Sequence, residues 1–317
     1  MIYAYGITLD GKYHVKNNIP NQDAFKIVKC NKNTVIAAVA DGLGSAEHSD
    51  IASKLAVEKS VAHCEKNIPH TKSKDELLPI IKESFLLAQN AIEDEAKTKE
   101  HDITKYDTTL TLVIFCEDTL FFGHSGDSGI VALTTEGLYK KVTEQQRDES
   151  SCVFPLFFKD KWIFEEYKDK VSSVFLATDG ILETLFPIYI RNEKLNIHIT
   201  LAQYFMDNRK LEIEKNGEEV VAKEIESFLD QIPEEQVNDD KTIVVLINTE
   251  VETKQQPDDY YKEPNWDELR RKFDEAYKMA AYPHLYANKK AKDGPEETVS
   301  EVSDDGMTKT KKNCNSN

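Results

Sequence analysis

Short runs of apolar residues without polar alternation are the feature that most restricts the fold of this chain. The segments VIAAVA (35–40) and VFLA (174–177) are apolar at every position. A strand with one face in water alternates apolar and polar residues, whereas a strand covered on both faces is apolar throughout. The sequence therefore predicts β-sheets that are buried between other layers of structure.

The order of the predicted elements favours an α+β sandwich over a doubly wound sheet. Two amphipathic helices, at about 50–67 and 75–97, follow the first strands, and two later helices are expected near 197–206 and 218–232. Four consecutive strands come after the first helix pair, so strands and helices do not alternate regularly. The predicted strands are rich in β-branched and aromatic residues: YAYGIT, NTVIAAVA, TTLTLVIF, TLFFGHSG, GIVALTT, GLYKKVT, SSVFLAT and KTIVVLI.

Composition divides the chain into three parts. Residues 1–249 contain all of these strands and form the predicted folded domain. Residues 250–285 form an extension around the helical segment WDELRRKFDEAYKMAA (266–281), which we expect to dock on the folded domain, with docking on a partner protein as the alternative. Residues 286–317 are polar and lack periodicity, so we expect a disordered tail.

Charge and cysteine usage exclude several classes of protein. The net charge of −17, from 40 Lys and Arg against 57 Asp and Glu, argues against binding to a phosphate backbone. The five cysteines have neither metal-binding nor disulfide spacing, which favours reduced thiols. The first residues lack the features of a signal peptide, and no apolar run approaches the ~20 residues of a membrane span. We expect a monomeric cytoplasmic protein that binds neither nucleic acid nor a membrane.

Aspartates recur at the ends of the predicted strands. Asp41-Gly42 and Asp179-Gly180 each follow an apolar run directly. Taken singly, each is more often a turn or a helix cap than a ligand. If the strand ends meet at one edge of a sandwich, however, the carboxylates converge and need cations to offset their repulsion. Three further aspartates are next to predicted strands: Asp23, Asp127 and Asp239.

This set of side chains indicates a particular chemistry. Oxygen ligands without a Cys or His cluster favour Mg²⁺ or Mn²⁺ over zinc, and glycine lets a neighbouring carbonyl approach the metal. A two-metal site lowers the pKa of a water molecule and neutralises phosphoryl charge, so phosphoester hydrolysis is the expected reaction. The chain lacks a Walker loop and a GxSxG elbow, which argues against ATP-driven transfer and against a serine hydrolase.

Six motifs together resemble a known family. QDAF, VADGLGS, DTTLTLVIF, GDSGI, FLATDGILE and DDKTIVVL occur in the order found in metal-dependent serine/threonine protein phosphatases of type 2C, and QDA is similar to a divergent bacterial branch. The resemblance covers residues 1–248. It implies a four-layer α-β-β-α sandwich of two mainly antiparallel sheets with a binuclear Mg²⁺ or Mn²⁺ centre.

The resemblance also implies roles for individual residues. Asp41 would bridge two metal ions, and the carbonyl of Gly42 would bind one of them. Asp179 and Asp239 would hold the other ion. Asp23, also among the metal-site residues, would orient the water molecule bound to metal, either directly or through a neighbouring group. Asp127, with Glu183, matches the position of a weaker third ion.

The phosphate-binding residues of the family are absent. The position of the usual arginine is occupied by Asn18, and the motif GDSR reads GDSG with Gly129. A guanidinium binds phosphate in a bidentate manner, which lysine does not. The nearest positive groups, Lys16 and His14, are therefore the candidate substrate ligands. The candidate general acids are His14, His48 and His124.

Three functions remain open from the sequence. The first is a phosphatase acting on phosphoserine or phosphothreonine in proteins, with a serine/threonine kinase or its target as partner. The second is a catalytically weak sensor or adaptor that binds and regulates such a partner. The third is a phosphatase for small molecules or nucleotides. The aromatic segment 147–169 is expected to form either a flap beside the site or a packed loop.

Overall fold

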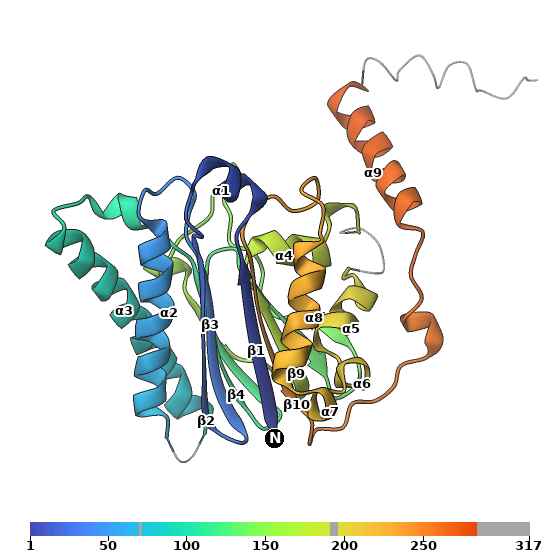
Figure 1. The fold of residues 1–317 in the computed structure, drawn as a ribbon, viewed down its shortest axis with the longest axis horizontal. Helices are drawn as coiled ribbons and strands as arrows, with labels where there is room; N and C mark the ends of the chain where they lie inside the picture. Colours follow the sequence, from blue (N-terminus) through green and yellow to red (C-terminus); the bar gives the residue numbers. More distant parts are fainter. Residues whose placement is uncertain (70–71, 191–195, 284–317) are drawn as a thin grey trace, which may run out of the picture. The chain divides into compact units, whose positions relative to one another are not determined.

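Two five-stranded antiparallel sheets form the centre of the fold (Figure 1). The computed structural model describes residues 1–69, 72–190 and 196–283, so the predicted tail and Cys314 lie outside the described residues. The first sheet has the order β1 (Ile2–Leu9), β10 (Lys241–Asn248), β9 (Val171–Ala177), β6 (Gly129–Thr134) and β7 (Tyr139–Lys141). The second has the order β2 (Asp23–Asn31), β3 (Thr34–Asp41), β4 (Leu110–Cys116), β5 (Thr119–Ser125) and β8 (Ile163–Glu166).

Helices cover the outer face of each sheet (Figure 1). The second sheet packs against α2 (Ser49–Asn67) and α3 (Lys74–Thr98), and the first against α4 (Asp179–Leu185), α5 (Ile199–Met206) and α8 (Glu218–Asp230). This is the predicted four-layer α-β-β-α sandwich, which the structure confirms. The remaining short helices are α1 (Lys12–Asn17), α6 (Asn208–Leu211), α7 (Ile213–Asn216) and the 3-10 turns Ile103–Tyr106, Lys159–Lys161, Ile188–Ile190 and Asp258–Tyr260.

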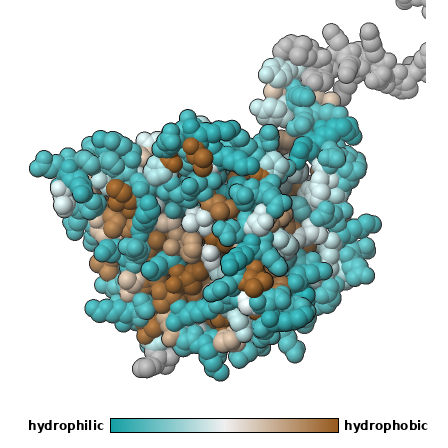
Figure 2. All heavy atoms as spheres, in the orientation of Figure 1, coloured by the Kyte–Doolittle hydropathy of each residue, from teal (hydrophilic) through white to brown (hydrophobic). Residues whose placement is uncertain are grey.

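The uninterrupted apolar sequence of β3 follows from its place in these layers. Val35, Ala37 and Val39 belong to the core between the two sheets. Ile36 and Ala38, on the opposite face of the strand, pack in the core beneath α2 and α3. Each fully buried Val or Ile contributes about 1.5–3 kcal/mol, so both faces of the strand stabilise the sandwich. On the side seen in Figure 2, hydrophilic residues cover most of the surface and apolar residues form separate patches.

The aromatic segment between Arg147 and Asp169 is partly packed and partly exposed. Trp162 and Phe164 contact Phe85 of α3 edge to face, with ring centroids 5.5 and 5.1 Å away. Phe157 and Phe158 are exposed. The short edge strand β8 within this segment was not among the predicted strands, because its residues have no apolar alternation.

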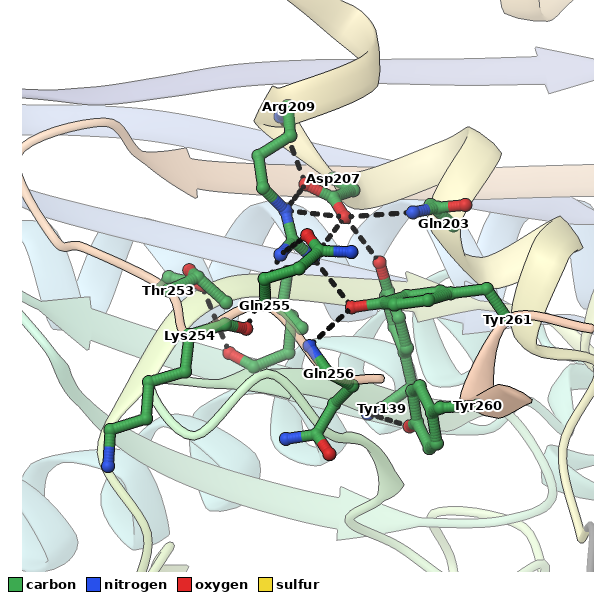
Figure 3. Close-up of polar contacts among 12 residues, drawn as sticks. Tyr139, Gln203, Asp207, Arg209, Thr253, Lys254, Gln255, Gln256, Tyr260 and Tyr261 are labelled. Atoms are coloured by element: carbon green, nitrogen blue, oxygen red, sulfur yellow. Dashed lines mark hydrogen bonds and ion pairs between the residues drawn. The ribbon is translucent and has the colours of Figure 1, made fainter. Parts of the chain in front are cut away.

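A C-terminal strap, residues 253–261, packs on the first sheet (Figure 3). Arg209 donates hydrogen bonds to the carbonyl of Lys254 and to Gln255, and Tyr260 accepts one from the backbone of Tyr139. Arg209 also binds the buried carboxylate of Asp207. The strap therefore belongs to the compact unit Met1–Pro264.

A second unit begins at Asn265 and contains the helix α9 (Trp266–Ala281), whose bounds are those predicted. None of its residues is buried, and docking of this helix stays a prediction. Among the described residues, no helix combines the length and apolar character that crossing a membrane requires.

Candidate metal centre

The strand register brings the predicted aspartates to one end of the sandwich. Asp23 starts β2 and lies opposite Asp41, the last residue of β3. Ala177 of β9 pairs with Ile243 of β10 on one side and with Gly129 of β6 on the other. Since each aspartate is within a few residues of one of these paired ends, the sheet geometry assembles the site from segments far apart in sequence. The side chains assembled in this way are Asp23, Asp41, Asp127, Asp179 and Asp239.

Two clusters of possible metal ligands contain members of this group. Asp41, Asp127 and Asp179 each offer a carboxylate oxygen, and these oxygens lie within 4.8 Å of one another. Asp239 belongs to a second cluster with His14 and Asp240.

The negative charges of the aspartates raise one another's pKa values. Burial raises the pKa of Asp41 well above its usual range, and the charges of Asp23, Asp179, Asp127 and Asp239 raise it further. Carboxylates this close repel unless cations are bound between them. The first cluster is made of oxygen ligands alone, which fits Mg²⁺ or Mn²⁺ rather than zinc.

Asp23 is one of the two most buried aspartates of the group, together with Asp127. Its side chain is buried, and it accepts a 2.8 Å hydrogen bond from the Thr178 hydroxyl. Burial raises its pKa, and the charges of Asp240 and Asp179 add to that effect. Asp23 is not in either cluster of converging ligand atoms among the described residues. This position suits a residue that supports the ligands from behind.

The glycines after Asp41 and Asp179 are required by close backbone approaches. A Cβ at Gly42 would lie 2.6 Å from the carbonyl oxygen of Ser49, and one at Gly180 would lie 2.3 Å from that of Asp240. No real Cβ tolerates such a contact with backbone. The repeated Asp-Gly motif thus lets the chain pass tightly beside both aspartates.

Two threonines fix the backbone of Asp41. The Thr109 hydroxyl accepts a 2.9 Å hydrogen bond from the Asp41 N–H, and the Thr108 hydroxyl donates one of 2.9 Å to the Asp41 carbonyl. The backbone of Asp41 is therefore fixed by hydrogen bonds that do not involve its carboxylate.

Asp240 is a buried residue of the site that the sequence analysis did not select. Its side chain is 3% exposed, against 58% for Asp239. Its carboxylate accepts hydrogen bonds of 2.7 Å from the N–H groups of Gly11 and Gln22 and lies 2.9 Å from His14 Nδ1. Asp240 thereby fixes the chain just before Asp23. The adjacency of Asp239 and Asp240 in the sequence could have indicated this residue, but the sequence does not tell which of the two side chains points inward.

Arg147 is the second residue that sequence reasoning missed. Its guanidinium binds Asp127 at 2.7 Å, Asp179 at 3.0 Å and Glu183 at 3.4 Å. Arg147 is 20 residues from Asp127 along the chain, in a segment with no recognisable motif. Only the fold brings it to the carboxylates.

The three candidate general acids differ in their surroundings. His124 is fully buried, and burial lowers its pKa to about 4. Its Nδ1 lies 2.9 Å from Thr111 Oγ1, and its Nε2 lies 3.0 Å from the Glu144 carbonyl oxygen.

The other two histidines are nearer the surface or the clusters. His48 stacks on His101, with ring centroids 4.5 Å apart. His14 contacts Asp240 and lies 3.5 Å from Asp239. Of the three, His14 alone contacts residues of the two clusters.

The residues at and near Asn18, where the resemblance implies a phosphate-binding arginine, have structural roles of their own. Asn18 ends α1 in the left-handed conformation, with φ 54°, which asparagine adopts more readily than arginine. Lys16 forms a 2.6 Å ion pair with Glu234, and its side chain is 62% exposed. An exposed pair of this kind is weak, so Lys16 can exchange partners at little cost.

We predict that the metal-free protein loses stability as the pH rises from about 4 to about 7. Burial and the charges of Asp127, Asp239 and Glu183 raise the pKa of Asp179 to about 7. The unfolded value is about 3.9, so between the two values the folded state binds more protons, and the free energy of unfolding falls with rising pH. Thermal melts in EDTA at about pH 5 and pH 8 measure this effect.

The variant Asp179→Asn isolates the contribution of this carboxyl, because every other titrating group is kept. Its melting temperature should fall less between the two pH values than that of the wild type. An equal fall in both proteins would contradict the prediction.

Comparison with known proteins identifies the family and the fold. A family model described as protein phosphatase 2C matches residues 10–230. A bacterial serine phosphatase is similar in structure, with 12% identity, a TM-score of 0.55 and coverage of 81% of this chain and 100% of that one. A search of curated proteins found no significantly similar sequence.

Two serine/threonine phosphatases share the fold. Stp1 from Staphylococcus aureus is 14% identical, with a TM-score of 0.54 and coverage of 78% and 95%. PstP/Ppp from Mycobacterium tuberculosis is 15% identical, with a TM-score of 0.54 and coverage of 78% and 98%.

An α-β-β-α sandwich whose strand ends bring carboxylates together is a class of fold that gathers the oxygen ligands Mg²⁺ and Mn²⁺ prefer. Within that class, this chain belongs to the protein phosphatase 2C family, a family of metal-dependent serine/threonine phosphatases. The predicted resemblance is confirmed, while the assignment to the branch with QDA stays a prediction.

Proposed function

We propose that this chain hydrolyses phosphoserine and phosphothreonine in proteins, using two Mg²⁺ or Mn²⁺ ions held by its aspartates. Ions bound there would lower the pKa of a water molecule and neutralise charge on the phosphoryl group. Membership of the family supports the reaction class. The cytoplasmic location, the monomeric state and a kinase or its target as partner stay predictions.

The observation that carries the proposal is the place of Asp41, whose carboxylate oxygen lies within 4.8 Å of those of Asp127 and Asp179 and which pairs with Asp23 in the strand register. Its pKa is raised by aspartates from four other segments: Asp23, Asp179, Asp127 and Asp239. A carboxylate placed among these charges is suited to bind both ions, as the resemblance implies. Asp179 and Asp239 would complete the ligand set, together with the carbonyl of Gly42.

The remaining residues would position the substrate and the ligands. Thr178 holds Asp23 through a hydrogen bond, which fixes a carboxylate behind the proposed ligands. His14 and Lys16 are both on α1 and remain the candidates for contact with substrate phosphate. Lys16 would exchange Glu234 for the phosphate group.

Release of phosphate from a phosphothreonine peptide tests the proposal. We expect turnover with Mn²⁺ or Mg²⁺, none in EDTA, and none for Asp179→Asn, because that substitution removes a proposed ligand. ATP and a phosphotyrosine peptide serve as comparison substrates. Faster turnover of ATP would favour the small-molecule alternative, and tight Mn²⁺ binding without hydrolysis of a broad phosphopeptide panel would favour the sensor or adaptor.

A further inference from the structure

The guanidinium of Arg147 occupies a position between carboxylates of the metal centre. Its Nε donates to Asp127 Oδ2 at 2.9 Å, and its Nη2 lies 2.7 Å from the same oxygen. Nη2 also lies 3.0 Å from Asp179 Oδ2 and 3.4 Å from Glu183 Oε1. One positively charged group therefore contacts three carboxylates.

The backbone around Arg147 is fixed by contacts that do not involve these carboxylates. The N–H of Gln146 donates to the Gly126 carbonyl at 2.9 Å, and the N–H of Gly126 donates to the Gln146 side chain at 3.0 Å. Gln145 donates to the backbone carbonyl of Asp127 at 3.1 Å. An isolated β-bridge joins Arg147 itself to Val153. The segment is thus tied to the turn that carries Asp127, which places the guanidinium beside the site.

The strength of these contacts follows from burial and geometry. The Asp127 side chain is 3% exposed and that of Arg147 is 29% exposed, so water screens the pair little. Arginine stays charged at all relevant pH values, and its planar fork binds carboxylates better than lysine does. An ion that needed the same oxygens of Asp127 and Asp179 would have to displace the guanidinium.

We infer that Arg147 is a built-in cation that takes the place of a third metal ion between Asp127, Asp179 and Glu183. The chain then binds two ions where the resemblance allows three. In this arrangement Asp127 is a ligand of arginine rather than of metal, and Arg147 positions Asp179 for the ions. The inference rests on the proposed two-ion centre.

Counting bound Mn²⁺ by electron paramagnetic resonance tests the inference. We expect two ions for the wild type, two for Arg147→Lys and three for Arg147→Gln, because only the glutamine variant removes the positive charge. A second readout does not depend on catalysis. In EDTA, Arg147→Gln should melt at a lower temperature than the wild type, and saturating Mn²⁺ should remove most of this difference.

Asp127→Asn provides a test if Arg147→Gln does not fold. Because Asp127 binds Arg147 under this inference, the asparagine variant should keep the two-ion count of the wild type. A lower count would make Asp127 a metal ligand and overturn the inference.

The other outcomes separate this inference from the proposed function. Three ions in the wild type, or two in a folded Arg147→Gln, would overturn the role of Arg147 and leave the two-ion centre in place. If folded Arg147→Gln bound two ions and its KM for the phosphopeptide rose, Arg147 would be a substrate ligand instead. A wild type that bound no Mn²⁺ would contradict the proposed function and this inference together.

Discussion

Replacing Asp41 by asparagine is expected to abolish metal-dependent hydrolysis while stabilising the metal-free protein. Loss of residues that merely support metal ligands costs 10–100-fold, so loss of the central ligand should exceed about 100-fold in kcat/KM. In EDTA the substitution removes one charge from a group of mutually repelling carboxylates, and the melting temperature should rise. The rise in melting temperature that Mn²⁺ produces in the wild type should be lost.

A matched control is Asp94→Asn, at an exposed position of α3 that is outside the site. It should change neither turnover nor the response to Mn²⁺. Hydrolysis by Asp41→Asn within tenfold of the wild type would contradict the proposed role of this residue.

Replacing Arg209 by alanine is expected to destabilise the protein without affecting the metal centre (Figure 3). Asp207 is 1% exposed, and Arg209 binds both of its oxygens through Nε and Nη2. Without the guanidinium, the buried carboxylate keeps the Tyr139 hydroxyl at 2.7 Å but loses its countercharge. Breaking a fully buried pair costs 3–5 kcal/mol, and because Arg209 is 29% exposed we expect about 2–3 kcal/mol.

Urea denaturation of the wild type and the variant measures this difference in the free energy of unfolding. The double variant Asp207→Asn with Arg209→Ala should recover part of the loss, because no unpaired charge remains. Arg271→Ala is the control, since Arg271 forms an exposed pair with Glu275 on α9 and should cost less than about 0.5 kcal/mol. An equal cost for Arg209→Ala and Arg271→Ala would show that the buried pair of Arg209 and Asp207 contributes no more than an exposed pair.

The sandwich could be predicted because its signals are local. A strand such as β3 has both faces buried, so its sequence is apolar at every position and needs no knowledge of its neighbours. The Asp-Gly pairs were informative for a similar reason. Each combines a carboxylate with a backbone approach that only glycine permits, at Gly42 and Gly180.

The missed residues depend on contacts between segments distant in sequence. Arg147 reaches Asp179 and Glu183 only because its segment is tied to the turn after β5. Asp239 and Asp240 are identical in type and adjacent, yet one is exposed and the other buried. Which of them points inward is decided by the N–H groups of Gly11 and Gln22, more than two hundred residues away.

The pairing of β1 with β10 has a consequence for the synthesis of the protein. These two strands form eight residue pairs, from Ile2 with Asn248 to Leu9 with Lys241, and β10 also joins β1 to the rest of its sheet. During translation, β1 therefore cannot pair with β10 until almost the whole unit has been synthesised. Asp23 and Asp41 are made early, but Asp239 joins them only with β10. A nascent chain, or one truncated before β10, thus lacks the assembled centre, so the proposed activity requires translation through β10.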